Sequence, residues 1–275
     1  MVNSIILNFI LLLTGIISVD EGDNVSSCGD VYLIAHRGGV VDEHHAENSR
    51  AAAVSAIDRG YWMLEVDIRE TRDNRAILQH DADFTRYYND NRKVSEMTWD
   101  QVRQLESSVD GERPILFREV AKLAAGQTRL MLDVKGNEFS DTFYREIEEA
   151  LVEYDLLESA YVLSGRQAQE YFSEKTSHSA NFEGVMKAAE AGEEVSRKYH
   201  LFELASNLNE EMIRQAEKLG VIVVAAVNEF RYVQAGEDVW EGAKRDVNRL
   251  LELGVKHYQI DSIYEPLFDH CNWVQ

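Results

Sequence analysis

Short apolar runs alternate with stretches of helical periodicity along most of this chain, and this alternation constrains its fold more than any other feature. The runs are rich in β-branched residues and are bounded by polar or glycine-containing segments. Strands of this composition are buried on both faces, as parallel strands covered by helices are. We expect strands at residues 31–35, 62–68, 129–134, 160–163, 200–204, 221–227 and 257–260, with a short additional strand at 76–79.

The helical stretches follow these strands at a regular pace. We expect helices at residues 46–59, 98–105, 117–125, 141–157, 167–173, 209–219 and 239–253, whereas residues 179–199 fit neither pattern clearly. The count is seven clear strand–helix units and one weak unit around residues 181–185. Eight such units make a closed (β/α)₈ TIM-type barrel, a fold that takes about 250 residues.

The alternative architecture is an open, doubly wound sheet, which binds nucleotides through a glycine-rich loop after its first strand. Neither a GxGxxG pattern nor a Walker loop follows residues 31–35. The barrel is therefore favoured. No proline-rich or serine-rich linker and no internal repeat divides the sequence, so we expect one barrel domain over residues 31–275.

Polar residues gather where the expected strands end. In a (β/α)₈ barrel the carboxyl ends of the strands meet at one face, which is where active sites lie. Residues two apart on a strand share a face, so pairs with that spacing point into the same mouth. The polar residues at these ends are His36, Arg37, Glu65, Asp67, His80, Asp133 and Lys135.

These residue types point to metal-assisted phosphoryl chemistry. Three carboxylates, Glu65, Asp67 and Asp133, would repel one another unless a cation lies between them, and oxygen ligands suit Mg²⁺ or Ca²⁺. The two histidines are either metal ligands or a general acid and a general base. Arg37 and Lys135 supply the positive charge that a phosphate group needs.

The charge balance excludes one class of partner. The chain has 28 Lys and Arg residues against 49 Asp and Glu residues, a net charge of −21. A protein this acidic repels a phosphate backbone at long range, so we expect no nucleic-acid partner. An anionic small-molecule substrate needs a metal ion or a few placed cations to reverse the field locally. The sequence leaves the oligomeric state open.

The first nineteen residues differ from the rest. Residues 1–19 contain no charged side chain and include a dense apolar run, which the acidic segment of residues 20–30 follows. Such a run is typical of a secretory signal peptide, and it is short for a bilayer span. We expect an exported protein, periplasmic or secreted, with no stable membrane span in the mature chain. The alternative is an uncleaved N-terminal anchor.

Four short motifs occur in a distinctive order: His36-Arg37-Gly38, Glu47-Asn48-Ser49, Glu65-Val66-Asp67 and His80-Asp81. This series resembles the glycerophosphodiester phosphodiesterase family, whose pattern runs HRG, PEN(T/S), ExD and HD. Weaker similarities around Asp133 and near the C-terminus extend the resemblance over residues 31–266. An aspartate at position 133 is also similar to the sphingomyelinase-D-type phospholipases.

The resemblance implies a TIM-type barrel, one divalent cation and hydrolysis of glycerophosphodiesters to glycerol 3-phosphate and an alcohol. By position, Glu65, Asp67 and Asp133 would hold the ion, and His36 and His80 would be the acid–base pair. Arg37 and Lys135 would grip the phosphate. For Glu47 the resemblance implies either support of these residues or contact with a substrate hydroxyl.

Two other functions remain open for such a barrel. One is a phospholipase-D-like lyase or hydrolase that acts on intact lipid phosphodiesters, and the other is a non-catalytic phosphosugar-binding barrel. About fifty residues separate His80 from the strand at 129–134. We therefore expect only a short insertion after the second strand, and an open mouth.

Cys28 and Cys271 are the two cysteines of the chain and lie near its opposite ends. In a closed barrel the first and eighth strands are neighbours. A helical return of about ten residues descends about 15 Å from the end of the eighth strand. Cys271 would then reach Cys28, and we expect a disulfide between them.

Overall fold

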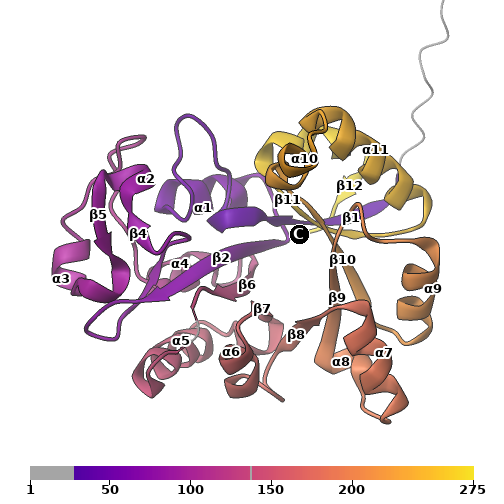
Figure 1. Cartoon of the computed structure of the whole chain (residues 1–275), viewed down its shortest axis with the longest axis horizontal. Helices are drawn as coiled ribbons and strands as arrows, with labels where there is room; N and C mark the ends of the chain where they lie inside the picture. Colours follow the sequence, from indigo (N-terminus) through magenta and orange to yellow (C-terminus); the bar gives the residue numbers. More distant parts are fainter. Residues whose placement is uncertain (1–27, 137) are drawn as a thin grey trace, which may run out of the picture.

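In the computed structural model, residues 28–136 and 138–275 are described, and they form a closed parallel barrel (Figure 1). Each barrel strand pairs in parallel with the next, and pairing of the first with the second closes the ring. Within the described residues, the eight strands of the ring are β1 (Asp30–Ala35), β2 (Met63–Glu70), β6 (Arg129–Val134), β7 (Tyr161–Ser164), β8 (Ser177–Ala180), β9 (Tyr199–Leu204), β10 (Ile222–Val227) and β11 (His257–Ile260). The predicted (β/α)₈ fold is confirmed.

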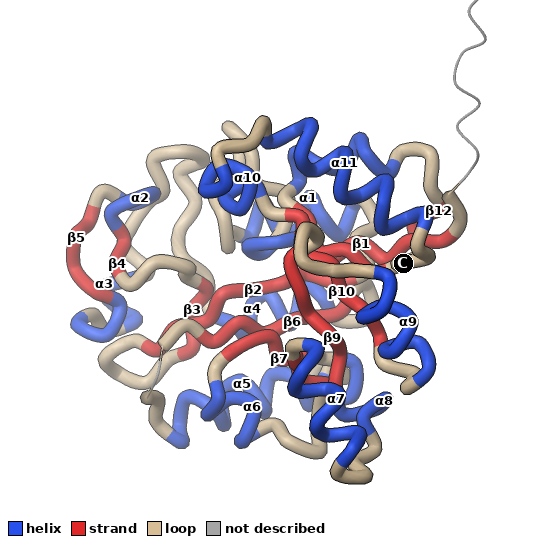
Figure 2. Tube along the Cα trace, turned by 45° about the vertical axis from the view of Figure 1, so that its right-hand side comes forward, coloured by secondary structure: helices blue, strands red, loops and turns tan. Residues whose placement is uncertain are grey.

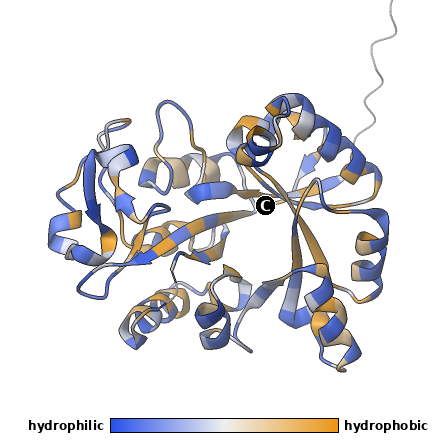
Figure 3. Ribbon diagram, viewed as in Figure 1, coloured by the Kyte–Doolittle hydropathy of each residue, from blue (hydrophilic) through white to orange (hydrophobic). Residues whose placement is uncertain are grey.

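Helices surround the barrel and leave its strands in the interior (Figure 2). They are α1 (Arg50–Asp58), α4 (Phe117–Ala124), α5 (Asp141–Glu153), α6 (Arg166–Tyr171), α7 (Phe182–Glu190), α8 (Val195–Lys198), α9 (Glu210–Lys218), α10 (Glu229–Ala235) and α11 (Val239–Glu252), with the 3₁₀ helices η1 (His36–Gly38), η3 (Leu157–Ser159) and η4 (Ser262–Phe268). Figure 3 shows the strands largely in the hydrophobic colour and many exposed helix surfaces in the hydrophilic one.

Side chains along β2 point alternately outward, towards the helices, and inward, towards the centre of the barrel. Leu64, Val66 and Ile68 point outward into the large apolar cluster beneath the helices. Met63 belongs to a smaller cluster inside the barrel. Because side chains two apart share a face of a strand, Glu65 and Asp67 also point inward, above this inner cluster.

The segment between β2 and α4 forms a small lobe, at the left of Figure 1. Strand β3 (Ala76–Leu78) folds back antiparallel onto β2. The rest consists of β4 (Asp83–Phe84), α2 (Thr85–Tyr88), β5 (Asp90–Lys93), η2 (Val94–Glu96) and α3 (Trp99–Val102). An apolar cluster of its own, which includes Phe84 and Met97, holds the lobe together. This is the short insertion expected after the second strand.

Two elements have bounds that differ from those expected from the sequence. The helix expected at 46–59 begins at Arg50, because Asn48 has a left-handed backbone (φ 56°) and the Ser49 side chain caps the helix by accepting from the amide of Ala52. The weak eighth unit has its strand at Ser177–Ala180, and Asn181 caps the following helix α7. This strand is short and polar, so it lacks the apolar run that identified the others.

A disulfide joins Cys28 to Cys271, with 4.9 Å between the Cα atoms. The last strand, β12 (Asn272–Trp273), pairs in parallel with the start of β1. The Asn272 side chain also donates a hydrogen bond to Asp30 at 2.6 Å. The predicted disulfide is confirmed, and it fastens the two ends of the described chain to each other.

No helix of the described residues is both long and apolar enough to cross a bilayer. The expected signal peptide of residues 1–19 and most of the acidic segment of residues 20–30 lie outside the described part of the chain.

A buried histidine that stays neutral lies near the amino-terminal ends of the barrel strands. His200 is fully buried, stacks on Tyr161 with 4.4 Å between ring centroids, and lies 3.1 Å from the hydroxyl of Ser177 through Nδ1. Its Nε2 has no hydrogen-bond partner among the described residues. Burial, with smaller contributions from two neighbouring histidines, lowers the pKa of His200 to about 3.

This histidine should make the fold sensitive to acid. An unfolded histidine binds a proton below about pH 6.5, whereas folded His200 stays neutral down to about pH 3. Stability is therefore lost as the pH falls from about 6.5. In His200→Phe, the fall in the free energy of unfolding between pH 7.5 and 4.5 should be smaller by about 2.7 kcal/mol. Urea unfolding at both pH values measures the free energy of unfolding. The exposed control His44→Phe should show the same fall as the unsubstituted protein. The same fall in His200→Phe would contradict the claim that His200 stays neutral in the folded state.

Candidate active site

The turn after β1 brings the first motif against the second and third. Arg37 has a left-handed backbone (φ 57°), and its amide donates to Glu65 Oε2 at 2.7 Å. A Cβ atom at Gly38 would lie 2.8 Å from the Cα of Asn48, and one at Gly39 would collide with the carbonyl of Ala52. Two glycines are therefore required here for the turn to pack against the loop before α1.

Asn48 locks this loop onto β2. Its side-chain amide donates to Asp67 Oδ2 at 2.7 Å, and its side-chain oxygen accepts from the Asp67 amide at 3.1 Å. Its own amide donates to the carbonyl of Arg37 at 2.8 Å. The sequence motif contained Asn48, but its role in positioning Asp67 emerges only from the structure.

Three carboxylates meet at the centre of the mouth. Glu65, Asp67 and Asp133 are 1%, 1% and 6% exposed, and one oxygen from each lies within 4.8 Å of the others. Asp67 and Asp133 are directly opposite each other in the register of β2 and β6. Burial, and then the charges of Asp67 and Asp133, raise the pKa of Glu65 well above its usual value. Burial also raises the pKa of Asp133.

Lys135 lies among these carboxylates. Its ammonium group hydrogen-bonds Asp133 and forms an ion pair with Asp67 Oδ1 at 3.0 Å. These two negative charges raise the pKa of Lys135 despite its burial. Lys135 was expected to grip phosphate; here its contacts are with two of the three carboxylates.

The acidic cluster fits a hard divalent cation. All three side chains offer oxygen atoms, the ligands that Mg²⁺ and Ca²⁺ prefer. Lys135 brings one positive charge to the three carboxylates, and the charges of Asp67 and Asp133 add to burial in raising the pKa of Glu65. A bound cation would relieve this repulsion, so Glu65, Asp67 and Asp133 are the residues suited to hold it.

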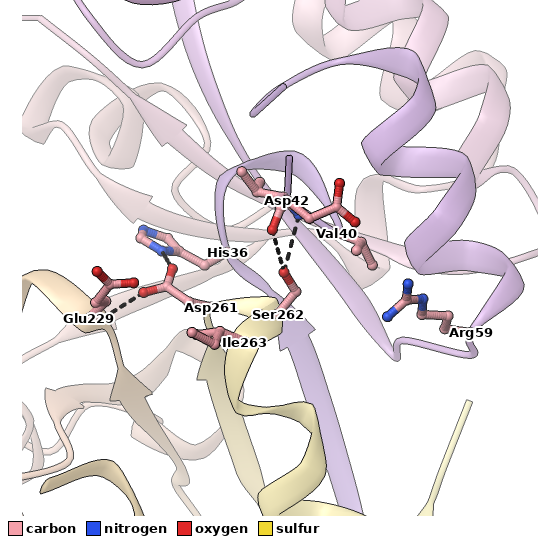
Figure 4. Close-up of a pocket in the computed structure, with 9 residues that line it drawn as sticks. His36, Val40, Asp42, Arg59, Glu229, Asp261, Ser262 and Ile263 are labelled. Atoms are coloured by element: carbon pink, nitrogen blue, oxygen red, sulfur yellow. Dashed lines mark hydrogen bonds and ion pairs between the residues drawn. The ribbon is translucent and has the colours of Figure 1, made fainter. Parts of the chain in front are cut away.

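His36 is held by a carboxylate at the end of β11. Its Nδ1 lies 2.5 Å from Asp261 Oδ1, and the other Asp261 oxygen accepts from the amide of Glu229 at 2.6 Å (Figure 4). Burial alone would raise the pKa of Asp261, but the hydrogen bond and the charge of His36 bring it below its usual value. This arrangement holds the proton on Nδ1 and leaves Nε2 for proton transfer.

His80 reaches the mouth from β3, outside the ring of barrel strands. Its Nδ1 lies 2.8 Å from Asp81 Oδ1. Arg69 of β2 fixes the position of the segment by donating two hydrogen bonds to the His80 carbonyl, at 3.0 and 2.7 Å. His80 is close enough to Asp133 for its charge to act on the pKa of that carboxyl. Each of the two expected histidines is thus paired with a carboxylate, and His80 lies near the acidic cluster.

The Glu47 carboxylate pairs with two arginine side chains. It is 5% exposed, and its Oε2 accepts from Arg37 at 2.6 Å, from Arg86 at 3.0 Å and from the Tyr87 hydroxyl at 3.4 Å. Arg86 also pairs with Asp81 at 2.9 Å. Glu47 thus pairs with two arginines, and it connects the lobe to the barrel.

Sequence reasoning did not select Asp261 as a site residue. The signal was present, because the residue ends the eighth strand and follows Gln259 on the inward face. Strand-end position alone did not distinguish it from an ordinary turn aspartate. Asn48 and Arg69 were missed for a similar reason, since their roles depend on contacts between separate loops.

Asp261→Asn should slow turnover without weakening substrate binding. Loss of the carboxylate leaves the His36 ring without its fixed tautomer, which in histidine-based sites costs orders of magnitude in rate. We expect kcat to fall at least about tenfold with little change in KM. Steady-state kinetics measure this split. A rise in KM with unchanged kcat would show that Asp261 does not position His36.

Comparisons with known proteins agree with this arrangement. The glycerophosphoryl diester phosphodiesterase family matches residues 36–247. Glycerophosphodiester phosphodiesterase 1 of Bos taurus is 30% identical over 121 residues, a match that covers 41% of this chain and 36% of that protein. The matched segment thus spans about a third of the length of this curated relative.

Solved structures show the same fold. A glycerophosphoryl diester phosphodiesterase of Parabacteroides distasonis is 20% identical with a TM-score of 0.66, over 86% of this chain and 85% of that one. A phosphodiesterase of Oleispira antarctica, solved in complex with the product sn-glycerol-3-phosphate, is 14% identical with a TM-score of 0.64, over 86% and 96% of the two chains. Since the family match covers most of the chain and includes both histidines and all three carboxylates, the chain belongs to the glycerophosphoryl diester phosphodiesterase family.

Proposed function

We propose that this protein hydrolyses glycerophosphodiesters to glycerol 3-phosphate and an alcohol. The proposal rests on one observation. Three buried carboxylates meet at the mouth of the barrel, and the site also contains two histidines, His36 and His80, each paired with a carboxylate. Membership of the family supports it, as does the product bound to the Oleispira antarctica phosphodiesterase.

In this proposal, arginines bind the phosphate and histidines transfer protons. Arg37 and Arg86 are held by Glu47 and offer positive charge beside the cluster, where the phosphate would lie. His36 and His80 exchange protons through Nε2: one takes a proton from the attacking group and the other gives one to the leaving alkoxide. The buried setting of the carboxylates strengthens these electrostatic contacts.

Glu65, Asp67 and Asp133 would hold one divalent cation, Mg²⁺ or Ca²⁺. When bound, such an ion draws charge from a non-bridging phosphate oxygen and lowers the barrier to attack at phosphorus. Asn48 keeps Asp67 in the orientation for this role through its two hydrogen bonds.

Cation binding should be visible as stabilisation. At a concentration one hundred times its Kd, an ion that binds only the folded state adds about 2.7 kcal/mol, or about 5–10 °C in melting temperature for a chain of this size. Thermal unfolding with Mg²⁺ and with Ca²⁺ measures this rise. It should disappear in Asp67→Asn and persist in the exposed control Glu210→Gln. Equal rises in both variants would place the ion elsewhere.

The assay that tests the proposed function follows glycerol 3-phosphate released from glycerophosphocholine and glycerophosphoethanolamine. We expect release that EDTA abolishes and added divalent cation restores. Absence of product from folded, cation-loaded protein would overturn the proposal. Product from intact lipid phosphodiesters alone would favour the phospholipase-D-like alternative.

We also propose that the protein is exported, by means of residues 1–19. The Cys28–Cys271 disulfide supports this proposal, because such bonds persist in oxidising compartments. N-terminal sequencing of the protein recovered outside the cytoplasm tests it: an N-terminus after the apolar run indicates a cleaved signal, and an intact Met1 in the membrane fraction indicates an anchor.

A further inference from the structure

A cavity of about 410 Å³ opens beside His36 (Figure 4). It is bounded by the loop after β1, the start of α10 and the 3₁₀ helix η4. His36 and Asp261 form part of its wall. Because His36 lines the cavity and is proposed to exchange a proton at the phosphate, one of the two groups esterified to that phosphate would lie in or beside the cavity.

One part of the cavity wall is apolar. Val40 and Val41 contribute from the loop after β1, and Ile263 contributes from η4. Two hydrogen bonds between Ser262 and the backbone of Val41, at 3.2 and 2.8 Å, hold these two segments together. Ile263 is 50% exposed, so it offers an apolar surface to a group bound in the cavity.

The other part of the wall is acidic. Glu229, at the N-terminus of α10, is exposed, and its carboxylate makes no hydrogen bond or ion pair within the described residues. Asp42 also lines the cavity and is paired with His45 at 2.8 Å. The cation in the wall, Arg59, is already paired with Glu265 at 2.7 Å. The cavity thus has an unneutralised negative charge next to an apolar surface.

We propose that this cavity binds the alcohol part of the substrate and selects alcohols that carry an ammonium group, of the choline or ethanolamine type. The inference rests on the proposed function. The positive charge would lie near Glu229, and the methyl or methylene groups would contact Val41 and Ile263. A neutral polyol would leave the apolar wall facing hydroxyl groups, and an anionic head group would face Glu229 and Asp42.

The test compares glycerophosphocholine with glycerophosphoglycerol, whose alcohol is neutral, as substrates of the full chain. The measured quantity is the ratio of their kcat/KM values. Because the attraction is between partly exposed charges, Glu229→Gln should lower this ratio by about three- to fivefold, and Glu229→Lys should lower it further. High salt should lower the ratio for the unsubstituted protein in the same direction.

Matched controls separate this inference from the proposed function. The exposed Glu241→Gln, on α11, should leave the ratio unchanged. Hydrolysis of both substrates with the same ratio in the unsubstituted protein, Glu229→Gln and Glu229→Lys would overturn the inference and leave the proposed function standing. Absence of turnover of both substrates would overturn the proposed function, and the inference with it.

Discussion

His36→Gln and His80→Gln should each lower kcat by about 10²–10⁴-fold, the contribution typical of a general acid or base. Each imidazole is oriented by a carboxylate through Nδ1, His36 by Asp261 at 2.5 Å and His80 by Asp81 at 2.8 Å. Glutamine keeps a polar side chain of similar length but cannot exchange a proton near neutral pH. The loss should therefore fall on kcat, measured by steady-state turnover of glycerophosphocholine.

The control for this prediction is His44→Gln. His44 lies on the loop after β1 with its side chain 76% exposed, and it should tolerate the change without loss of rate. The His36→Gln and His80→Gln variants should keep the thermal response to divalent cations, because neither histidine belongs to the three-carboxylate cluster. A variant that retains kcat within a few-fold, or that loses the response to the ion, would contradict the assigned role.

Removal of the disulfide should cost about 2–4 kcal/mol of folding free energy. Cys28 and Cys271 are separated by 243 positions, so the bond restricts the unfolded chain strongly. It also anchors the pairing of β12 with β1. The double variant Cys28→Ser/Cys271→Ser should show this loss in urea unfolding.

Reductant supplies the internal control. The unsubstituted protein in dithiothreitol should match the double serine variant in oxidising buffer, and the variant should not respond to reductant. Two free thiols on titration of the denatured, unreduced protein would contradict the disulfide, as would a stability that reductant does not change.

The strands that the sequence revealed share one physical property. β1, β2, β6 and β10 are buried on both faces, so each reads as a continuous apolar run that polar residues interrupt only at the site. β8 (Ser177–Ala180) is four residues long and polar, and its place in the barrel depends on pairing with its neighbours rather than on its own composition.

Some residues of the candidate site could likewise be predicted from the sequence, and others could not. Glu65, Asp67 and Asp133 could be predicted because their spacing fixes the face of a strand. His36 and His80 could be predicted as part of the motif series. The contacts of Lys135 with Asp67 and Asp133 could not, because they depend on how β2 and β6 are registered. Asp261 could not either, since its partner is 225 positions away.

Phosphorus NMR of glycerophosphocholine incubated with the cation-loaded protein tests the central claim most directly. The diester resonance should be replaced by that of the monoester glycerol 3-phosphate, with choline released in equal amount. EDTA should stop this conversion. A cyclic phosphate as the final product, phosphocholine in place of glycerol 3-phosphate, or an unchanged diester resonance would contradict hydrolysis of glycerophosphodiesters at this site.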